Sequence, residues 1–245
     1  MHFCPNEFIN MKVILLGYGK MGKIIERVAL DRGHQISARI DIHNSSDFDM
    51  ATGDVAIEFS HPDAAFENVK KCIERKLPVV CGTTGWLKRK PEIEELCRKN
   101  NATFFYASNY SLGVNVFFKL NEYAARMMNS LSEYEISMDE IHHTEKKDAP
   151  SGTAITLAEG IIGHVERKKQ WVNQKTDRPE DVFIESFRID QVPGTHIVKF
   201  ESAVDDIEIK HIAHSREGFA KGAVMVAEWV REKKGVFTMD DFLKI

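Results

Sequence analysis

The fold prediction starts from residues 12–22, whose sequence is Lys-Val-Ile-Leu-Leu-Gly-Tyr-Gly-Lys-Met-Gly. Residues 12–17 are a short, mostly apolar run of the kind that a buried parallel strand shows. Residues 24–30 carry apolar side chains at the spacing of a helix. The glycines between them permit a tight turn, close approach of the backbone to a pyrophosphate, and close packing of helix on strand. This order indicates a dinucleotide-binding loop. Its expected cofactor contacts are Gly17, Tyr18, Gly19, Lys20, Met21 and Gly22.

A second strand, residues 35–40, ends at Asp41. An acid at this place accepts hydrogen bonds from the 2′-hydroxyl of an adenine ribose and repels a 2′-phosphate. Asp41 therefore favours NADH over NADPH as the cofactor. Lys20, Arg39 and His43 could supply positive charge nearby, so the use of both nicotinamides stays open.

The alternation of strands and helices continues to residue 109. Strands are expected at 54–60, 78–85 and 103–109, and helices at 62–75 and 88–100. This order predicts an α/β fold, a doubly wound, Rossmann-like parallel sheet that binds its ligand at the carboxyl ends of the strands. Small and hydroxyl residues at those ends suit a nicotinamide ribose, although they are also ordinary turn formers. The further expected cofactor contacts are Phe59, Ser60, Gly82, Thr83, Thr84, Ala107, Ser108, Asn109 and Tyr110.

The pattern changes near Gly113. A helix over 114–130 leads to strands at 134–143, 181–189, 194–203 and 207–214, with a helix at 153–165 between the first two. These elements predict an α+β substrate domain with a mostly antiparallel or mixed sheet, and a polar, exposed loop over 168–179. A sheet with one open face favours a homo-oligomer, with a tetramer favoured over a dimer.

The last expected helix, residues 217–233, carries an apolar stripe that would be wet if it stood alone, so it should return to the first domain. The predicted organisation is therefore a dinucleotide-binding domain of residues 11–112 and 216–245, and a substrate-binding and oligomerisation domain of residues 113–215. Residues 1–10 are expected to be a loose extension, or to follow an upstream start codon that precedes Met11.

Composition excludes several classes of function. A net charge of −4 and a pI near 6.2, without a basic run, argue against binding to nucleic acid. The four cysteines form no CxxC pair and no metal-ligand spacing with histidine, so they are expected to be reduced thiols in a cytoplasmic protein without a metal. No apolar run approaches the about 20 residues of a membrane span.

Residues 140–154 are the stretch richest in reactive side chains: Glu-Ile-His-His-Thr-Glu-Lys-Lys-Asp-Ala-Pro-Ser-Gly-Thr-Ala. They connect a strand to a helix N-terminus, where backbone N–H groups and the helix dipole attract a carboxylate or phosphate. An imidazolium and an ammonium beside such a site suit a small acidic substrate that must be protonated. Pro-Ser-Gly-Thr is also a good helix start whatever the function, and loop lysines are usually solvated. The density of these groups in one loop favours function.

Together with the glycine loop, Gly82–Gly85, 108–115 and 219–223, this stretch resembles the dihydrodipicolinate reductase family. It matches Glu-x-His-His-x-x-Lys-x-Asp-x-Pro-Ser-Gly-Thr-Ala at every fixed position, and the resemblance runs from Met11 to the C-terminus. The sequence departs from the family pattern at Arg188-x-Asp190 and in a shortened region around residues 165–190.

The resemblance implies NAD(P)H-dependent reduction of 4-hydroxy-tetrahydrodipicolinate, a small cyclic dicarboxylate, in the diaminopimelate route to lysine. It implies that His142 is the general acid or proton relay and that Lys146 is a proton donor. By the same resemblance, the substrate carboxylates are held by His143, Ser151, Gly152 and Thr153.

Two other functions are consistent with parts of the sequence. Another two-domain NAD(P)-dependent dehydrogenase of amino-acid metabolism, of the aspartate or homoserine type, would share the glycine loop but would not require the stretch 140–154. A non-catalytic NAD(H)-sensing regulator would be expected to have lost the reactive residues, and here they are intact.

Overall fold

The computed structural model describes residues 10–244, which divide into two compact units. The first unit takes in the chain up to Ser111 and again from Glu217 onward, and the second is Leu112–Arg216. The expected N-terminal extension lies, apart from Asn10, outside the described residues. Within residues 10–244 no helix combines the length and hydrophobicity needed to cross a membrane.

The first unit is built on a six-stranded parallel sheet, as the alternating pattern predicted. Apart from Lys12, every residue of its central strands β1, β3 and β4 is buried, which explains their mostly apolar sequences. The strands lie in the order β11 (Gly235–Phe237), β5 (Thr103–Tyr106), β4 (Val79–Cys81), β3 (Val55–Glu58), β1 (Lys12–Leu16) and β2 (Gln35–Ile40).

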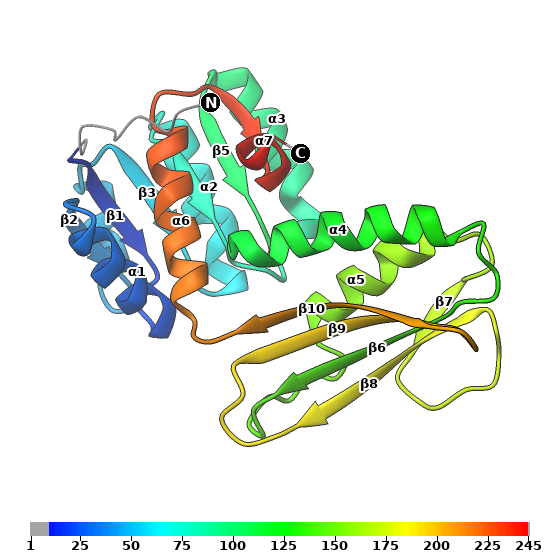
Figure 1. Ribbon diagram of the computed structural model, residues 1–245. Coiled ribbons are helices and arrows are strands. Elements are labelled where there is room, and N and C mark those ends of the chain that lie inside the picture. Colours follow the sequence, from blue (N-terminus) through cyan, green and yellow to red (C-terminus); the bar gives the residue numbers. More distant parts are fainter. Residues whose placement is uncertain (1–9, 245) are drawn as a thin grey trace. The chain divides into compact units, whose positions relative to one another are not determined.

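Helices cover both faces of this sheet (Figure 1). The helices α1 (Lys20–Asp31) and α6 (Glu217–Val230) lie side by side on one face, and α2 (Pro62–Glu74) and α3 (Lys90–Asn100) lie on the other. The ion pair between Arg32 and Glu228, 2.7 Å long, joins α1 to α6. A doubly wound, Rossmann-like fold is therefore confirmed for this unit.

The end of the chain differs from the prediction. The helix expected over 217–233 ends at Val230, and it is followed by β11 and by α7 (Met239–Leu243). The strand β11 has only three residues and starts at Gly235 with φ +132°, so it carries no alternation that a sequence pattern could reveal. It pairs with β5 and closes one edge of the sheet.

The second unit is a mixed sheet with α4 (Leu112–Met128) and α5 (Gly152–Ile162) packed on one face. The first three strands in the following order pair antiparallel, and the last three pair parallel, which confirms the predicted mixed sheet. The order is β10 (Asp206–Ala213), β9 (Gly194–Glu201), β6 (Glu135–His142), β8 (Asp181–Arg188) and β7 (Gln170–Val172).

The prediction of an exposed loop over 168–179 is wrong at its start. Residues 170–172 form β7, and Lys168 is only 1% exposed. The ammonium of Lys168 donates to the carbonyl oxygens of Pro179 and Asp181, at 2.9 and 2.8 Å, and pairs with Glu135. These partners make burial of the lysine ammonium tolerable, although the polar composition of residues 168–179 predicts an exposed loop.

Candidate active site

A pocket of about 550 Å³ lies at the carboxyl ends of β1, β2 and β3 in the first unit. Five residues of the predicted cofactor set line it: Gly17, Gly19, Asp41, Phe59 and Ser60. The other lining residues, which no sequence motif indicates, lie at or after the end of β2 and at the start and in the middle of α2. They are Ile40, Ile42, Ser45, His61, Asp63, Ala64 and Asn68.

The glycine loop fits a pyrophosphate. Gly17 has φ +97°, and a Cβ there would come within 2.1 Å of the Phe59 carbonyl oxygen. A Cβ on Gly22 would come within 2.2 Å of the Gly17 carbonyl oxygen, whereas one on Gly19 would meet nothing within 4 Å. Gly19 is also the N-cap of α1, where no side chain caps the helix and the first turn has no acid. The backbone N–H groups of α1 therefore suit an anionic ligand.

None of the other predicted cofactor residues lines the pocket. A Cβ on Gly82 would come within 2.2 Å of the Phe59 ring, and the Thr83 hydroxyl accepts the Ser60 N–H at 2.9 Å, so both shape the pocket from behind. Tyr110 is 1% exposed and donates its hydroxyl to the Cys81 carbonyl at 2.7 Å, which makes it a core residue. The predicted residues outside the lining are Tyr18, Lys20, Met21, Gly22, Gly82, Thr83, Thr84, Ala107, Ser108, Asn109 and Tyr110.

Arg39, a positively charged residue near Asp41, is paired with Glu26 and does not line the pocket. The Arg39 guanidinium donates to the Glu26 carboxylate, with Nε at 3.0 Å from Oε1, and lies 5.8 Å from the centre of the Tyr18 ring. The Tyr18 hydroxyl donates to the same carboxylate. Arg39 is thus engaged on the α1 side, while Asp41 lines the pocket.

In the second unit, β6 presents its buried residues to the face covered by α4 and α5. Glu140 and His142 are 0% and 7% exposed on that face, and His143, just past the strand, is half-buried. The chain then turns, with the Lys146 N–H donating to the His143 carbonyl at 3.1 Å, and enters α5. The strand therefore delivers His142 alone of the two histidines to the buried face.

The N-terminus of α5 has the features expected of a carboxylate site. Ser151 is the N-cap, 3% exposed, and its hydroxyl oxygen accepts the Ala154 N–H at 3.2 Å. Gly152 and Thr153 form the first turn, which carries no acidic side chain. An added Cβ on Gly152 would meet nothing within 4 Å, so the backbone there is open to a ligand.

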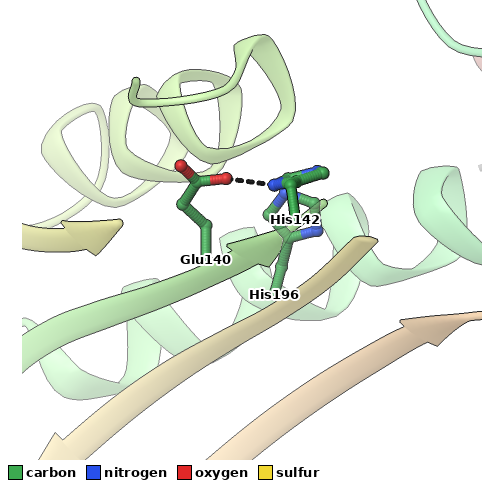
Figure 2. A group of neighbouring side chains, drawn as sticks. All are labelled: Glu140, His142 and His196. Atoms are coloured by element: carbon green, nitrogen blue, oxygen red, sulfur yellow. Dashed lines mark ion pairs between the residues drawn. The ribbon is translucent and has the colours of Figure 1, made fainter. Parts of the chain in front are cut away.

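The pairing register of the strands brings Ser186 and His196, which no sequence motif indicates, next to Glu140. Glu140 is paired with Ser186 of β8 on one side and with His196 of β9 on the other, so the three form one row across the sheet. Figure 2 shows the Glu140 carboxylate in contact with Nδ1 of His142, with the ring of His196 close by. The two imidazole rings meet edge to face, with centroids 5.1 Å apart.

Arg188, at the end of β8, joins this row to the lysine-bearing loop. Its guanidinium donates to Glu140 at 2.8 Å and to the Lys146 carbonyl at 3.2 Å. The Lys146 ammonium in turn lies 2.8 and 2.9 Å from the carboxylate oxygens of Asp148. Arg188 therefore fixes the loop that carries Lys146 relative to the partner of His142.

Glu140 remains ionised in the neutral range. Burial acts to raise its pKa, but hydrogen bonds from His142, Ser186 and Arg188 outweigh burial and bring the pKa to about 2. His196 has the opposite preference, because burial, with a smaller electrostatic contribution from the neighbouring His142, lowers its pKa to about 3. The ionised Glu140 carboxylate therefore faces Nδ1 of His142, and the neutral ring of His196 packs against the ring of His142.

Donor atoms of Glu140, His142 and His196 lie within 4.8 Å of one another, the arrangement of a possible divalent-cation site. Glu140 is already in direct contact with His142 and paired with Arg188. The two oxygens of the Glu140 carboxylate are thus already engaged, one by the His142 ring and the other by the Arg188 guanidinium.

Comparison with known proteins gives the same family for both units. The model of the dihydrodipicolinate reductase N-terminus matches residues 11–110, and that of the C-terminus matches residues 113–243. A 4-hydroxy-tetrahydrodipicolinate reductase of Christiangramia forsetii is 48% identical over 237 residues, which cover 95% of this chain and 98% of that protein. The reductase of Archaeoglobus fulgidus is 34% identical and covers 96% of this chain and 100% of its own.

The fold comparison agrees. The structure described as dipicolinate-bound dihydrodipicolinate reductase from Paenisporosarcina sp. TG-14 matches with a TM-score of 0.77 at 21% identity, over 94% of this chain and 98% of that one. At this identity the match concerns the fold alone. The two family models and the relatives that match over nearly their full length show that this chain belongs to the dihydrodipicolinate reductase family.

Proposed function

We propose that this protein is a 4-hydroxy-tetrahydrodipicolinate reductase, which reduces its cyclic dicarboxylate substrate with a pyridine nucleotide in the diaminopimelate route to lysine. The observation that carries the proposal is the family membership of both units, together with an intact His-His-x-x-Lys and Pro-Ser-Gly-Thr stretch. We assign the first unit to dinucleotide binding, and the second to substrate binding and oligomerisation.

In the proposed reaction the substrate loses water to give a conjugated imine. A reduced nicotinamide bound to the first unit would supply a hydride to ring carbon 4 of this imine. As the electron pair moves toward the ring nitrogen, the reduced ring must take up one proton, which residues of this chain would supply. His142 holds that proton on an imidazole whose Nδ1 is fixed by Glu140, and Lys146 stabilises the developing negative charge. Ser151, Gly152 and Thr153 at the α5 N-terminus, with His143, hold the carboxylates.

The activity is tested by following NADH oxidation with the freshly generated product of the upstream synthase as acceptor. Turnover with this acceptor, and none with aspartate semialdehyde or oxaloacetate, is the expected result. Turnover with either alternative acceptor but not with the synthase product would assign the chain to another dehydrogenase class. Absence of turnover with all three, while NADH still binds, would favour a sensing role.

We further propose that NADH is preferred over NADPH. Asp41 lines the pocket and would repel a 2′-phosphate, and Arg39 is engaged by Glu26 and Tyr18. At partly solvated separations of about 4 Å, repulsion between two charges is worth about 1 kcal/mol or more, so we expect Kd for NADPH to exceed that for NADH by roughly five- to tenfold. Asp41→Asn should remove most of this difference, as measured by titration calorimetry.

Asp63 is a matched control, because it lines the same pocket but belongs to α2 rather than to the end of β2. Asp63→Asn is expected to change Kd for NADH and NADPH by the same factor. Tighter binding of NADPH than of NADH by the unaltered protein would contradict the assignment of Asp41.

We also propose a homotetramer in the cytoplasm. The tetramer is supported by Phe187, Ile207 and Ile212, which lie on the open face and edge of the second sheet and are between 36% and 48% exposed. The cytoplasm is supported by the buried thiols of Cys72, Cys81 and Cys97, which fit a reducing compartment. Sedimentation velocity should give a particle of four 27.9-kDa chains. Ile207→Asp with Ile212→Asp should dissociate it, and Val204→Asp, at a 92% exposed hairpin position, should not. A monomer at micromolar concentration would refute the tetramer, and cell fractionation tests the compartment.

A further inference from the structure

His196 is a buried residue of the second unit to which the proposed reaction gives no role. It lies on β9, 5% exposed, and its ring packs edge to face against His142. Its Nε2 lies 3.0 Å from the hydroxyl oxygen of Ser151, while its Nδ1 is buried without a hydrogen-bond partner. One ring nitrogen therefore contacts the expected carboxylate site, and the other makes no bond.

The direction of the hydrogen bond between His196 and Ser151 decides what Ser151 can offer a ligand. A neutral imidazole carries one N–H and one bare nitrogen. If the serine hydroxyl donates to Nε2, the N–H of His196 is on Nδ1 and is buried without an acceptor. If Nε2 donates to the serine oxygen, only a bare lone pair is left at Nδ1. Buried N–H groups without partners are the rarer of the two cases in folded proteins, so the second arrangement is favoured.

In that arrangement the Ser151 oxygen accepts two hydrogen bonds, one from Nε2 of His196 at 3.0 Å and one from the Ala154 N–H at 3.2 Å. Both of its acceptor positions are then used by the protein. Its own hydrogen has no role in capping α5 and is left for an acceptor outside the protein. A carboxylate oxygen at the N-terminus of α5 is such an acceptor.

We propose that His196 is a positioning residue for substrate binding: its Nε2–H fixes the Ser151 oxygen so that the serine hydroxyl donates to a carboxylate of the dicarboxylate substrate. The inference rests on the proposed function for the class of ligand. It predicts an effect on carboxylate binding rather than on proton transfer, because His196 touches Ser151 and not the reacting carbon. Two mutually supporting bonds on one oxygen also strengthen that hydroxyl as a donor.

The first test reads the tautomer in the unaltered protein. The ¹⁵N shifts of histidine-labelled protein distinguish a pyrrole-type from a pyridine-type nitrogen, and the signal lost in His196→Gln identifies His196. A pyrrole-type Nε2 with a pyridine-type Nδ1 is expected. A proton on Nδ1 would overturn the proposal.

The second test measures Kd for pyridine-2,6-dicarboxylate and the kinetic constants of the variants. His196→Leu removes the donor and should raise Kd and KM about tenfold, with kcat changed less than about threefold, as expected for loss of one hydrogen bond to a charged group. His196→Gln can place an N–H near the Nε2 position and should recover most of the affinity. His164→Leu, beyond the other end of α5, is the matched control and should change neither constant.

A Kd for His196→Leu within twofold of the unaltered value would overturn the proposal, as would a loss of kcat without a change in Kd. These outcomes are separate from failure of the proposed function. A chain that binds the dicarboxylate through Ser151 but does not turn over the synthase product would refute the activity and leave the role of His196 standing.

Discussion

Replacing His142 with glutamine is expected to lower kcat by roughly 10²-fold or more, as loss of a positioned general acid usually does. Nδ1 of His142 contacts the buried Glu140 carboxylate, so the ring is fixed and Nε2 is the nitrogen left for the substrate. Gly194 keeps space beside that nitrogen, since a Cβ there would come within 3.1 Å of Nε2. Glutamine can keep a hydrogen bond to Glu140 but cannot transfer a proton.

The variant is measured by steady-state turnover and by Kd for NADH. Cofactor binding should be unchanged, because His142 belongs to the second unit and the nucleotide pocket to the first. His164→Gln provides a matched histidine control with no contact to Glu140. If His142→Gln retained kcat within about threefold of the unaltered enzyme, His142 would not be the proton source.

Lys146→Ala is expected to lower kcat by about 10²-fold, while Lys147→Ala leaves it near the unaltered value. The two lysines are adjacent in sequence, but they differ in burial and in their contacts. Lys146 is half-buried, is paired with Asp148 at 2.8 Å, and has its backbone held by Arg188. Lys147 is exposed. An ammonium held in one place can stabilise charge that develops on the substrate, and a solvated one contributes little.

The comparison of these two variants in the same assay separates a positional effect from a general loss of positive charge. Equal losses in both would indicate that the loop attracts the substrate only by its net charge, and such losses would shrink with added salt. Retention of kcat by both would remove Lys146 from the mechanism. Thermal melting of each variant checks that the fold is intact.

The strands and helices of the first unit could be predicted from the sequence because the patterns that indicate them lie within short stretches of the chain. The strand over residues 35–40 lies where it was expected, and the glycine loop leads from β1 into α1 as its spacing predicts. Burial on both faces produces the apolar runs of β1, β3 and β4, and glycine or a hydroxyl residue follows the ends of β1, β3, β4 and β5 within two residues. The strand β11 has only three residues, too few to show such an apolar run.

The stretch 140–154 is recognisable in the sequence for a different reason, because its reactive residues lie close together along the chain. Its supporting residues do not. Glu140, His196 and Arg188 meet only because β9 and β8 pair with β6 in one register, and no pattern within a single strand encodes which row faces which. His196 in particular alternates with its neighbours like any half-exposed strand residue, so only the paired sheet reveals that its Nε2 contacts Ser151.

A crystal structure of this protein with pyridine-2,6-dicarboxylate bound would test whether residues 140–154 form the substrate site. We expect one carboxylate within hydrogen-bond distance of the Ser151 hydroxyl and of backbone N–H groups at Gly152 and Thr153, with the ligand ring beside His142 and Lys146. A ligand bound elsewhere on the chain, with residues 140–154 making no contact to it, would contradict the account.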